Sequence, residues 1–223
     1  MTKDNSTPML AKDYDTGINK TVPFYNEFYN QTLDVITQCG FSNIEWLDLG
    51  CGTGTLEQIA LQRLQSVKFT ALDPSEQMLE QARIKLEGKP IEYICSSSTS
   101  INIVNRFDVV TAIQSNHYLQ KSERKVVTEK VFNSLKQGGI YISFENVVPE
   151  DDDIKKSELL RWGKYQQRNG KTIEEARLHN ARCGVEYFPL TVSEHIKLLK
   201  DTGFQKCHVF WLSYMQMGIY GIK

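Results

Sequence analysis

The sequence predicts an α/β fold with a doubly wound, seven-stranded sheet that is mostly parallel, and three observations support this prediction. Short apolar runs alternate with helical runs between Ile44 and Glu145, an order that requires parallel strands joined by right-handed helical crossovers. Closely spaced glycines follow the first apolar run directly. Two final runs, 207–214 and 217–223, predict a strand hairpin that closes the sheet.

Length, composition and charge favour a single cytoplasmic domain. The 223 residues, 40% of them apolar, can bury one substantial core. The net charge of -1 gives no positive field across the whole protein, so nucleic-acid and membrane partners are not expected. No apolar run approaches the roughly 20 residues that span a bilayer, and the polar N-terminus does not resemble a signal peptide.

The cysteines are scattered and do not suggest a metal site. They form no C-x-x-C pair, and no histidine spacing suggests zinc. We expect reduced thiols and no metal. The cysteines are Cys39, Cys51, Cys95, Cys183 and Cys207.

The expected elements follow one another without a repeat or a low-complexity linker. Residues 1–43 form a leading helical segment, in which the first twelve residues are polar and expected to fray. A turn at Pro23 opens an amphipathic helix that has Phe24 among its apolar residues and stops near Gly40. The alternating region contains strands at 44–49, 67–72, 91–95, 107–113 and 140–145, and helices at 56–64, 75–86 and 122–135.

Residues 151–189 form a helical insertion after the fifth strand. Its two helical stretches are rich in Arg, Tyr and Trp, which makes it the candidate for a substrate lid. The alternative is a helical pair that only pads the fold. Thr191 and Glu194 then form a predicted capping box that opens the next helix.

The glycine turn at Gly50, Gly52 and Gly54 indicates a nucleotide-like ligand. Glycines permit positive φ and let a ligand approach the backbone, and the next helix presents free N–H groups at its start. The pattern is G-x-G-x-G; a dinucleotide fingerprint would need a third glycine where Thr55 stands, which argues against NAD. Asp73 ends the second strand, where an acid usually binds the ribose hydroxyls.

These motifs resemble those of the class I S-adenosylmethionine-dependent methyltransferases. DLGCGTG resembles their first motif, and ALDPSEQML resembles the acid after the second strand. FDVVTAIQSNHYL, LKQGGIYISFE and the closing hairpin extend the likeness over nearly the whole chain. The resemblance implies a Rossmann-like fold, S-adenosyl-L-methionine as cofactor and methyl transfer to a small-molecule substrate.

The resemblance also implies the residues that bind the cofactor. The methionine end lies over the glycine turn, Asp48 orders that turn through backbone N–H groups, and Asp73 accepts both ribose hydroxyls. Tyr14 and Tyr25 close over the methionine end, where aromatic faces attract a sulfonium; a core or surface role is the alternative. The implied set is Tyr14, Tyr25, Asp48, Gly50, Cys51, Gly52, Gly54, Asp73, Pro74, Ser75, Met78, Ser96, Ser97, Ser98 and Gln114.

One position departs from the family pattern. Members usually carry an Asp after the third strand that holds the adenine amino group, whereas this chain has Ser96, Ser97 and Ser98. A hydroxyl or a backbone carbonyl can replace the acid, because an amino donor requires only an acceptor.

The loop from Gln114 to Tyr118 is expected between the sulfonium and the substrate. His117 is the candidate general base at neutral pH, and loop packing is its alternative role. Tyr118 is a candidate substrate contact. The insertion supplies the other candidates, which are Arg161, Trp162, Tyr165, Arg177 and Arg182.

Within the family the chain most resembles the branch that contains carboxy-S-adenosylmethionine synthase. That branch has an arginine from the insertion that pairs with the carboxylate of the modified cofactor, but neither Arg177 nor Arg182 aligns cleanly with it. Three hypotheses follow: a methyltransferase, a carboxy-S-adenosylmethionine synthase-like enzyme, and a non-catalytic cofactor-binding subunit with a protein partner. A homodimer remains open.

Overall fold

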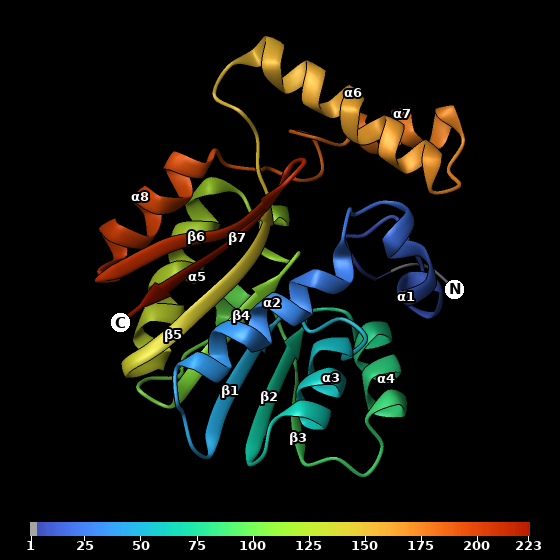
Figure 1. The fold of residues 1–223 in the computed structure, drawn as a ribbon. Coiled ribbons are helices and arrows are strands. Elements are labelled where there is room, and N and C mark those ends of the chain that lie inside the picture. Colours follow the sequence, from blue (N-terminus) through green and yellow to red (C-terminus); the bar gives the residue numbers. More distant parts are fainter. Residues whose placement is uncertain (1–3) are drawn as a thin grey trace.

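A seven-stranded sheet organises the molecule (Figure 1), and the computed structural model describes residues 4–223. The strand order is β3-β2-β1-β4-β5-β7-β6. β1 to β5 pair in parallel, and β7 runs antiparallel between β5 and β6. This arrangement confirms the predicted doubly wound sheet with its closing hairpin. The strands are β1 (Ile44–Leu49), β2 (Val67–Asp73), β3 (Ile91–Cys95), β4 (Phe107–Ile113), β5 (Leu135–Asn146), β6 (Lys206–Ser213) and β7 (Gln216–Ile222).

The one large boundary difference is at the start of β5. The strand begins at Leu135 instead of Ile140. Gly138 has a φ of +79°, and the pairing with β4 shifts register between Phe107 and Val109. Gly138 and Gly139, which precede the expected start of the strand, therefore form a bulge within it.

Helices cover both faces of the sheet. α2, α3 and α4 pack on one face, and α5 and α8 pack on the other. Neighbouring residues of β1 face opposite layers: Trp46 joins the α2 side, and Leu47 joins the α5 side. Burying each such side chain stabilises the fold by roughly 1.5–3 kcal/mol. The helices are α2 (Tyr25–Gln38), α3 (Thr55–Arg63), α4 (Glu76–Lys85), α5 (Lys121–Ser134) and α8 (Val192–Thr202).

The leading helix α2 packs its apolar face on the sheet as predicted, with one exception. Phe28 and Ile36 are almost fully buried, and Phe28 stacks on Phe144 of β5 with ring centroids 4.4 Å apart. Phe24, expected on this face, precedes the helix with a φ of +55° and is 55% exposed. Its left-handed backbone turns the side chain away from the core.

The first described residues are not frayed, contrary to the prediction. Asp4 accepts hydrogen bonds from the Ser75 hydroxyl at 2.6 Å and from the backbone N–H of Gln77 at 3.2 Å. Its carboxylate therefore lies at the start of α4, where a helix favours negative charge. The segment continues through η1 (Ala11–Asp13), α1 (Tyr14–Gly17) and η2 (Ile18–Lys20) toward α2.

The insertion forms the predicted pair of helices, α6 (Asp152–Arg168) and α7 (Ile173–Ala181). Figure 1 shows this pair standing away from the sheet, above the N-terminal segment. Trp162 donates from its ring nitrogen to the carbonyl of Thr21 at 2.7 Å. The Thr191–Glu194 capping box before α8 is confirmed. Among residues 4–223, no helix is both long enough and apolar enough to cross a membrane.

Candidate active site

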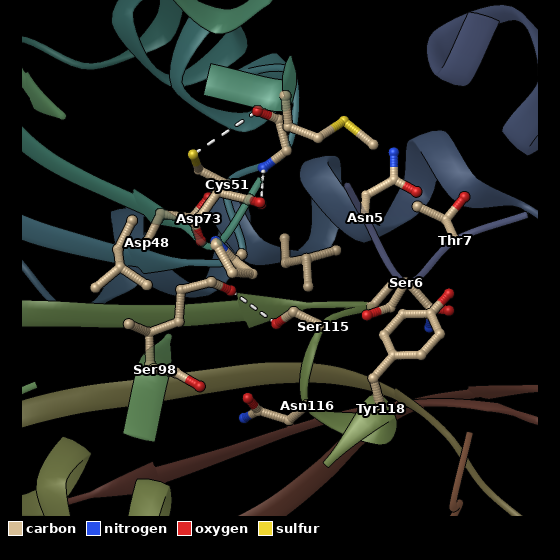
Figure 2. Close-up of a pocket in the computed structure, with 18 of the residues that line it drawn as sticks. Asn5, Ser6, Thr7, Asp48, Cys51, Asp73, Ser98, Ser115, Asn116 and Tyr118 are labelled. Atoms are coloured by element: carbon tan, nitrogen blue, oxygen red, sulfur yellow. Dashed lines mark hydrogen bonds between the residues drawn. The ribbon is translucent and has the colours of Figure 1, made fainter. Parts of the chain in front are cut away.

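A large cavity lies at the carboxyl ends of β1, β2 and β4, where ligands of such sheets bind. It encloses about 1030 Å³, counted out to its open mouth. Figure 2 shows Asp48, Cys51 and Asp73 on one side, and Ser115, Asn116 and Tyr118 on another. Asn5, Ser6 and Thr7 also line it. The N-terminal segment therefore forms part of the wall, which polar composition alone did not indicate.

The glycine turn has the backbone that only glycine adopts easily. Gly50 and Gly52 have φ values of +73° and +56°. A Cβ added at Gly50 would lie 2.4 Å from the Cβ of Ser115, whereas one added at Gly52 would meet nothing within 4 Å. The backbone at Gly52 is therefore open to a ligand, which fits the predicted approach of a cofactor to this turn.

Asp73 ties the turn to the start of α4. One carboxylate oxygen accepts from the N–H of Gly52 at 2.9 Å, and the other accepts from the N–H of Ser75 at 2.9 Å. Burial raises the pKa of Asp73, and these two N–H groups oppose the rise. Because each carboxylate oxygen accepts more than one hydrogen bond, Asp73 retains acceptor capacity toward the cavity that it lines.

Asp48 orders the site differently from the expectation. The N–H groups of Gly50 and Cys51 are taken by the carbonyl of Leu72, so Asp48 accepts instead from the Thr111 hydroxyl at 2.5 Å. Burial and the neighbouring Asp73 raise the pKa of Asp48 to about 7, while the hydrogen bond from Thr111 opposes the rise.

Glu57 is a feature that the sequence prediction missed. It belongs to the first turn of α3 and is fully buried against Asp48. Burial and the Asp48 charge raise its pKa well above the usual range. Its place in the first turn of the helix that follows the glycine turn was the available signal.

The structure brings most of the predicted cofactor residues to this cavity. Three do not line it. Gly54 packs closely on Ala82 and Leu86 of the neighbouring segment. The Ser75 hydroxyl caps α4 by accepting from the N–H of Met78. Ser96 donates its N–H to the backbone carbonyl of Asp73. Those that line the cavity are Tyr14, Tyr25, Asp48, Gly50, Cys51, Gly52, Asp73, Pro74, Met78, Ser97, Ser98 and Gln114.

A smaller cavity of about 410 Å³ adjoins the first. The two share four lining residues, which are Thr7, Tyr14, Gln114 and Tyr118. The smaller cavity also contacts the insertion through Trp162, His179, Arg182 and Tyr187. The insertion therefore forms part of the wall of a second chamber next to the large cavity.

His117 lines this smaller cavity from η4 (Asn116–Tyr118). Burial and the positive charges of Arg124 and Arg182 hold the pKa of His117 well below 6.5, so its ring is neutral at pH 7. A neutral imidazole has a free lone pair, which a general base requires. His179 is also buried and neutral, because burial lowers its pKa to about 3.

Of the five candidates from the insertion, two line the smaller cavity. They are Trp162 and Arg182. The other three line neither cavity and have other partners. Arg161 pairs with Glu158 and Arg177 with Glu174 in their own helices, and the Tyr165 hydroxyl donates to the carbonyl of Asn19 in the N-terminal segment.

Arg182 joins the insertion to the N-terminal segment. Its Nη2 donates to the carbonyl of Ser6 at 3.1 Å, and its Nε donates to Glu186 at 2.7 Å. The positive charge of Arg182 partly offsets the burial that raises the pKa of the Tyr118 hydroxyl. Arg182 is the one charged side chain among the described residues of the smaller cavity.

The described residues offer no cluster of three or more His, Cys, Asp or Glu side chains that could hold a metal ion. All five cysteines are free thiols.

Comparison with known proteins agrees with this geometry. The methyltransferase domain family matches residues 47–139. Carboxy-S-adenosyl-L-methionine synthase of Nautilia profundicola is 25% identical over 202 residues, covering 90% of this chain and 86% of that protein. The enzyme of the same name from Shewanella loihica is 25% identical over 222 residues, covering 96% and 90%.

Solved methyltransferases share the fold. CurJ carbon methyltransferase superposes with a TM-score of 0.69 at 18% identity, covering 93% of this chain and 57% of that one. Phosphoethanolamine N-methyltransferase 2 of Haemonchus contortus gives a TM-score of 0.62 at 18% identity, with 89% and 42% covered.

Proposed function

We propose that this chain, which is a class I S-adenosylmethionine-dependent methyltransferase, transfers a methyl group to a small polar acceptor bound in the smaller cavity. The adjoining pair of cavities carries the proposal. The larger one presents the glycine turn and Asp73, as the cofactor requires, and the smaller one opens from the side of Gln114 and Tyr118. A chamber lined mainly by buried and half-buried side chains suits a small molecule and not a nucleic acid.

Buried polar atoms around the smaller cavity support a polar acceptor. Six of its side chains carry atoms that are buried without a hydrogen-bond partner: Thr21 Oγ1, Gln114 Nε2, His117 Nδ1, Asn146 Oδ1, Tyr187 Oη and both ring nitrogens of His179. An unpaired buried polar group costs about 1–3 kcal/mol. A methyl acceptor with hydroxyl, carbonyl or carboxylate groups would form hydrogen bonds with these atoms and so offset part of that cost.

The residues around the two cavities contribute mainly by positioning. The bound cofactor supplies an electrophilic methyl group on a sulfonium. Tyr14 and Tyr25, whose hydroxyls lie 3.2 Å apart, place aromatic rings at the wall nearest the expected methionine end. Holding the acceptor in line in a site closed to water supplies much of the rate, and His117 is the candidate base for an acceptor that must lose a proton.

A second function, carboxy-S-adenosylmethionine synthase-like chemistry, is favoured by Arg182. This arginine from the insertion lies beside Tyr118 at the junction of the two cavities. A guanidinium there is suited to a carboxylate on a modified cofactor. The full-length relatives that carry this enzyme's name support the alternative.

Mass spectrometry of the ligand released from denatured, freshly purified protein separates these functions. S-adenosylmethionine or its demethylated product supports the methyltransferase, and a carboxylated cofactor supports the alternative. Absence of both, with added cofactor bound but not consumed, would favour the non-catalytic cofactor-binding subunit that acts through a protein partner.

The remaining assignments follow from the same features. We place the enzyme in the cytoplasm, which the free thiols support. A homodimer is compatible with the insertion standing away from the sheet. Size-exclusion chromatography with light scattering tests the dimer directly.

A further inference from the structure

A buried charged cluster lies behind the smaller cavity, away from the predicted cofactor contacts. Glu145 near the end of β5 and Arg124 of α5 are 1% and 2% exposed. His117 of η4 and His195 of α8 complete the cluster, with His195 Nε2 lying 3.5 Å from Arg124 Nη1. Burying an ion pair is costly unless close contact and further hydrogen bonds offset the desolvation, and Arg124 and Glu145 approach only to 3.9 Å, so the arrangement requires an explanation.

The two oxygens of Glu145 have different surroundings. Oε1 accepts a hydrogen bond from the Ser143 hydroxyl at 2.6 Å. Oε2 lies 3.9 Å from His117 Nδ1 and 3.9 Å from Arg124 Nη1. Glu145 Oε2 and His117 Nδ1 are both buried without a hydrogen-bond partner. A movement of about 1 Å would join them in a hydrogen bond of ordinary length.

The insertion holds both sides of this contact. The carbonyl of Phe188 accepts from Arg124 Nη2 at 2.9 Å, and the N–H of Phe188 donates to the carbonyl of His117 at 2.7 Å. Phe188, the residue before the end of the insertion, therefore fixes the backbone of His117 and the cationic neighbour of Glu145 together. Closing the insertion over an acceptor would act directly on the gap between Glu145 and His117.

We propose that Glu145 is the positioning residue of His117. Its carboxylate accepts a hydrogen bond from Nδ1–H of His117, which leaves Nε2 unprotonated. Nε2 lies on the opposite side of the ring, and His117 lines the cavity. When the acceptor atom bonds to the methyl carbon, the carbon–sulfur bond breaks, its electron pair goes to sulfur, and the acceptor's proton goes to Nε2. This inference rests on the proposed methyl transfer with His117 as base.

The Glu145 carboxylate is important because the other charged neighbours of His117 are cationic. The positive charges of Arg124 and Arg182 both disfavour a charged His117 ring. Glu145 is the one acid within 4 Å of that ring among the described residues. An imidazolium formed during the reaction would therefore depend on Glu145 for compensation.

Nitrogen-15 spectra of the histidine rings test the proposal without needing turnover. The wild-type protein has four histidines, and a His117→Gln spectrum assigns the signal. With S-adenosylhomocysteine bound, we expect the Nδ1-protonated tautomer of His117 to predominate at pH 7.5 in the wild type and in Glu145→Gln, whose amide oxygen can still accept. Predominance of the Nε2-protonated tautomer in the wild type would overturn the proposal.

Glu145→Leu gives the complementary test, because it removes the acceptor at similar volume. We expect the Nε2-protonated tautomer to take over, and kcat to fall by about 10- to 100-fold while the dissociation constant of the cofactor stays within twofold. An unchanged tautomer in folded Glu145→Leu would contradict the assignment. If that variant does not fold, the wild-type and Glu145→Gln spectra still decide. Failure of the wild-type protein to bind the cofactor would instead refute the proposed function.

Discussion

The two cavities are built in different ways, although they share a wall. Much of the cofactor cavity comes from backbone at strand ends, with the glycine turn after β1 and Asp73 at the end of β2. The acceptor cavity, as we name the smaller one, is formed by side chains from the N-terminal segment, η4, β5 and the insertion. Local sequence therefore specifies the first, whereas only the tertiary fold assembles the second.

The buried titratable groups of the two regions also differ. Beside the cofactor cavity, burial raises the pKa values of Asp48 and Glu57, which favours their protonated, neutral forms. Around the acceptor cavity, burial lowers the pKa values of His117 and His179, which favours their deprotonated, neutral forms. Both regions thus limit buried charge, and they respond to pH in opposite directions.

Replacing residues 151–189 with a short linker should have the largest effect. The insertion supplies Trp162 and Arg182 to the acceptor cavity but none of the described lining of the cofactor cavity. We expect turnover to be abolished, while the cofactor dissociation constant, measured by calorimetry, changes by less than about tenfold, or roughly 1.4 kcal/mol. A small loss of cofactor affinity is expected because Arg182 contacts Ser6.

A double substitution of Arg161→Gln and Arg177→Gln is the matched control. These exposed arginines pair within their own helices and line neither cavity, so both turnover and cofactor binding should stay near the wild-type values. Equal loss of cofactor affinity and turnover on removing the insertion would erase the distinction between the two regions.

The next effect concerns His117. If the acceptor is a hydroxyl or a protonated amine, His117→Ala should reduce kcat by about 10²- to 10⁴-fold with cofactor binding intact. If it is a thiolate or a free amine, the loss should be small. Since its folded pKa lies well below 6.5, activity that depends on neutral His117 should persist as the pH falls from 8 to 6.5. Exposed His208 on β6 provides the control, His208→Ala.

The different construction of the cavities explains how much could be predicted from sequence. The strands β1, β3 and β4 match their predicted bounds; β1 and β4 are almost continuously buried runs, whereas the residues of the edge strand β3 are only half-buried or exposed. The glycine pattern likewise located the turn at Gly50. The packing of Asp4 on Ser75 was not predictable, because it joins residues far apart in sequence and a polar composition gives no indication of docking.

The acceptor cavity shows the same limit. Arg182 and Arg177 lie on one short segment, and nothing in their local sequence shows that only Arg182 reaches the cavity. Its contact with Ser6 depends on how the insertion folds back over the N-terminal segment. The Asp48–Glu57 contact similarly depends on the angle between β1 and α3, which spacing alone does not give.

Asp73→Ala tests the cofactor cavity in isolation. Removing the carboxylate eliminates the predicted ribose contacts and the two N–H bonds that tie Gly52 to Ser75. Each charge-assisted hydrogen bond contributes roughly 1.5–3 kcal/mol, so cofactor affinity should fall at least tenfold by calorimetry. Glu92→Ala, which removes an exposed carboxylate on β3 that pairs with Arg106, should leave cofactor binding normal. An unchanged dissociation constant in folded Asp73→Ala would remove the ribose assignment.

The smallest effect is on stability and concerns His179 of the acceptor cavity. Its pKa is about 3 in the folded protein and near 6.5 when unfolded. Below pH 6.5 the unfolded chain binds a proton that the folded chain does not, so stability present above pH 6.5 is lost as pH falls toward 3. The loss approaches about 1.4 kcal/mol for each pH unit.

Urea unfolding at pH 7.5, 6.5 and 5.5 measures this dependence. His179→Gln should lose less stability between pH 6.5 and 5.5 than the wild type, by about 1 kcal/mol, even if its stability at pH 7.5 is lower because the ring no longer packs on Trp162. His208→Gln, at an exposed position, should keep the wild-type slope. A wild-type slope in His179→Gln would mean that this ring is accessible to protons in the folded state, and the acceptor cavity would then be a solvated pocket and not a closed chamber.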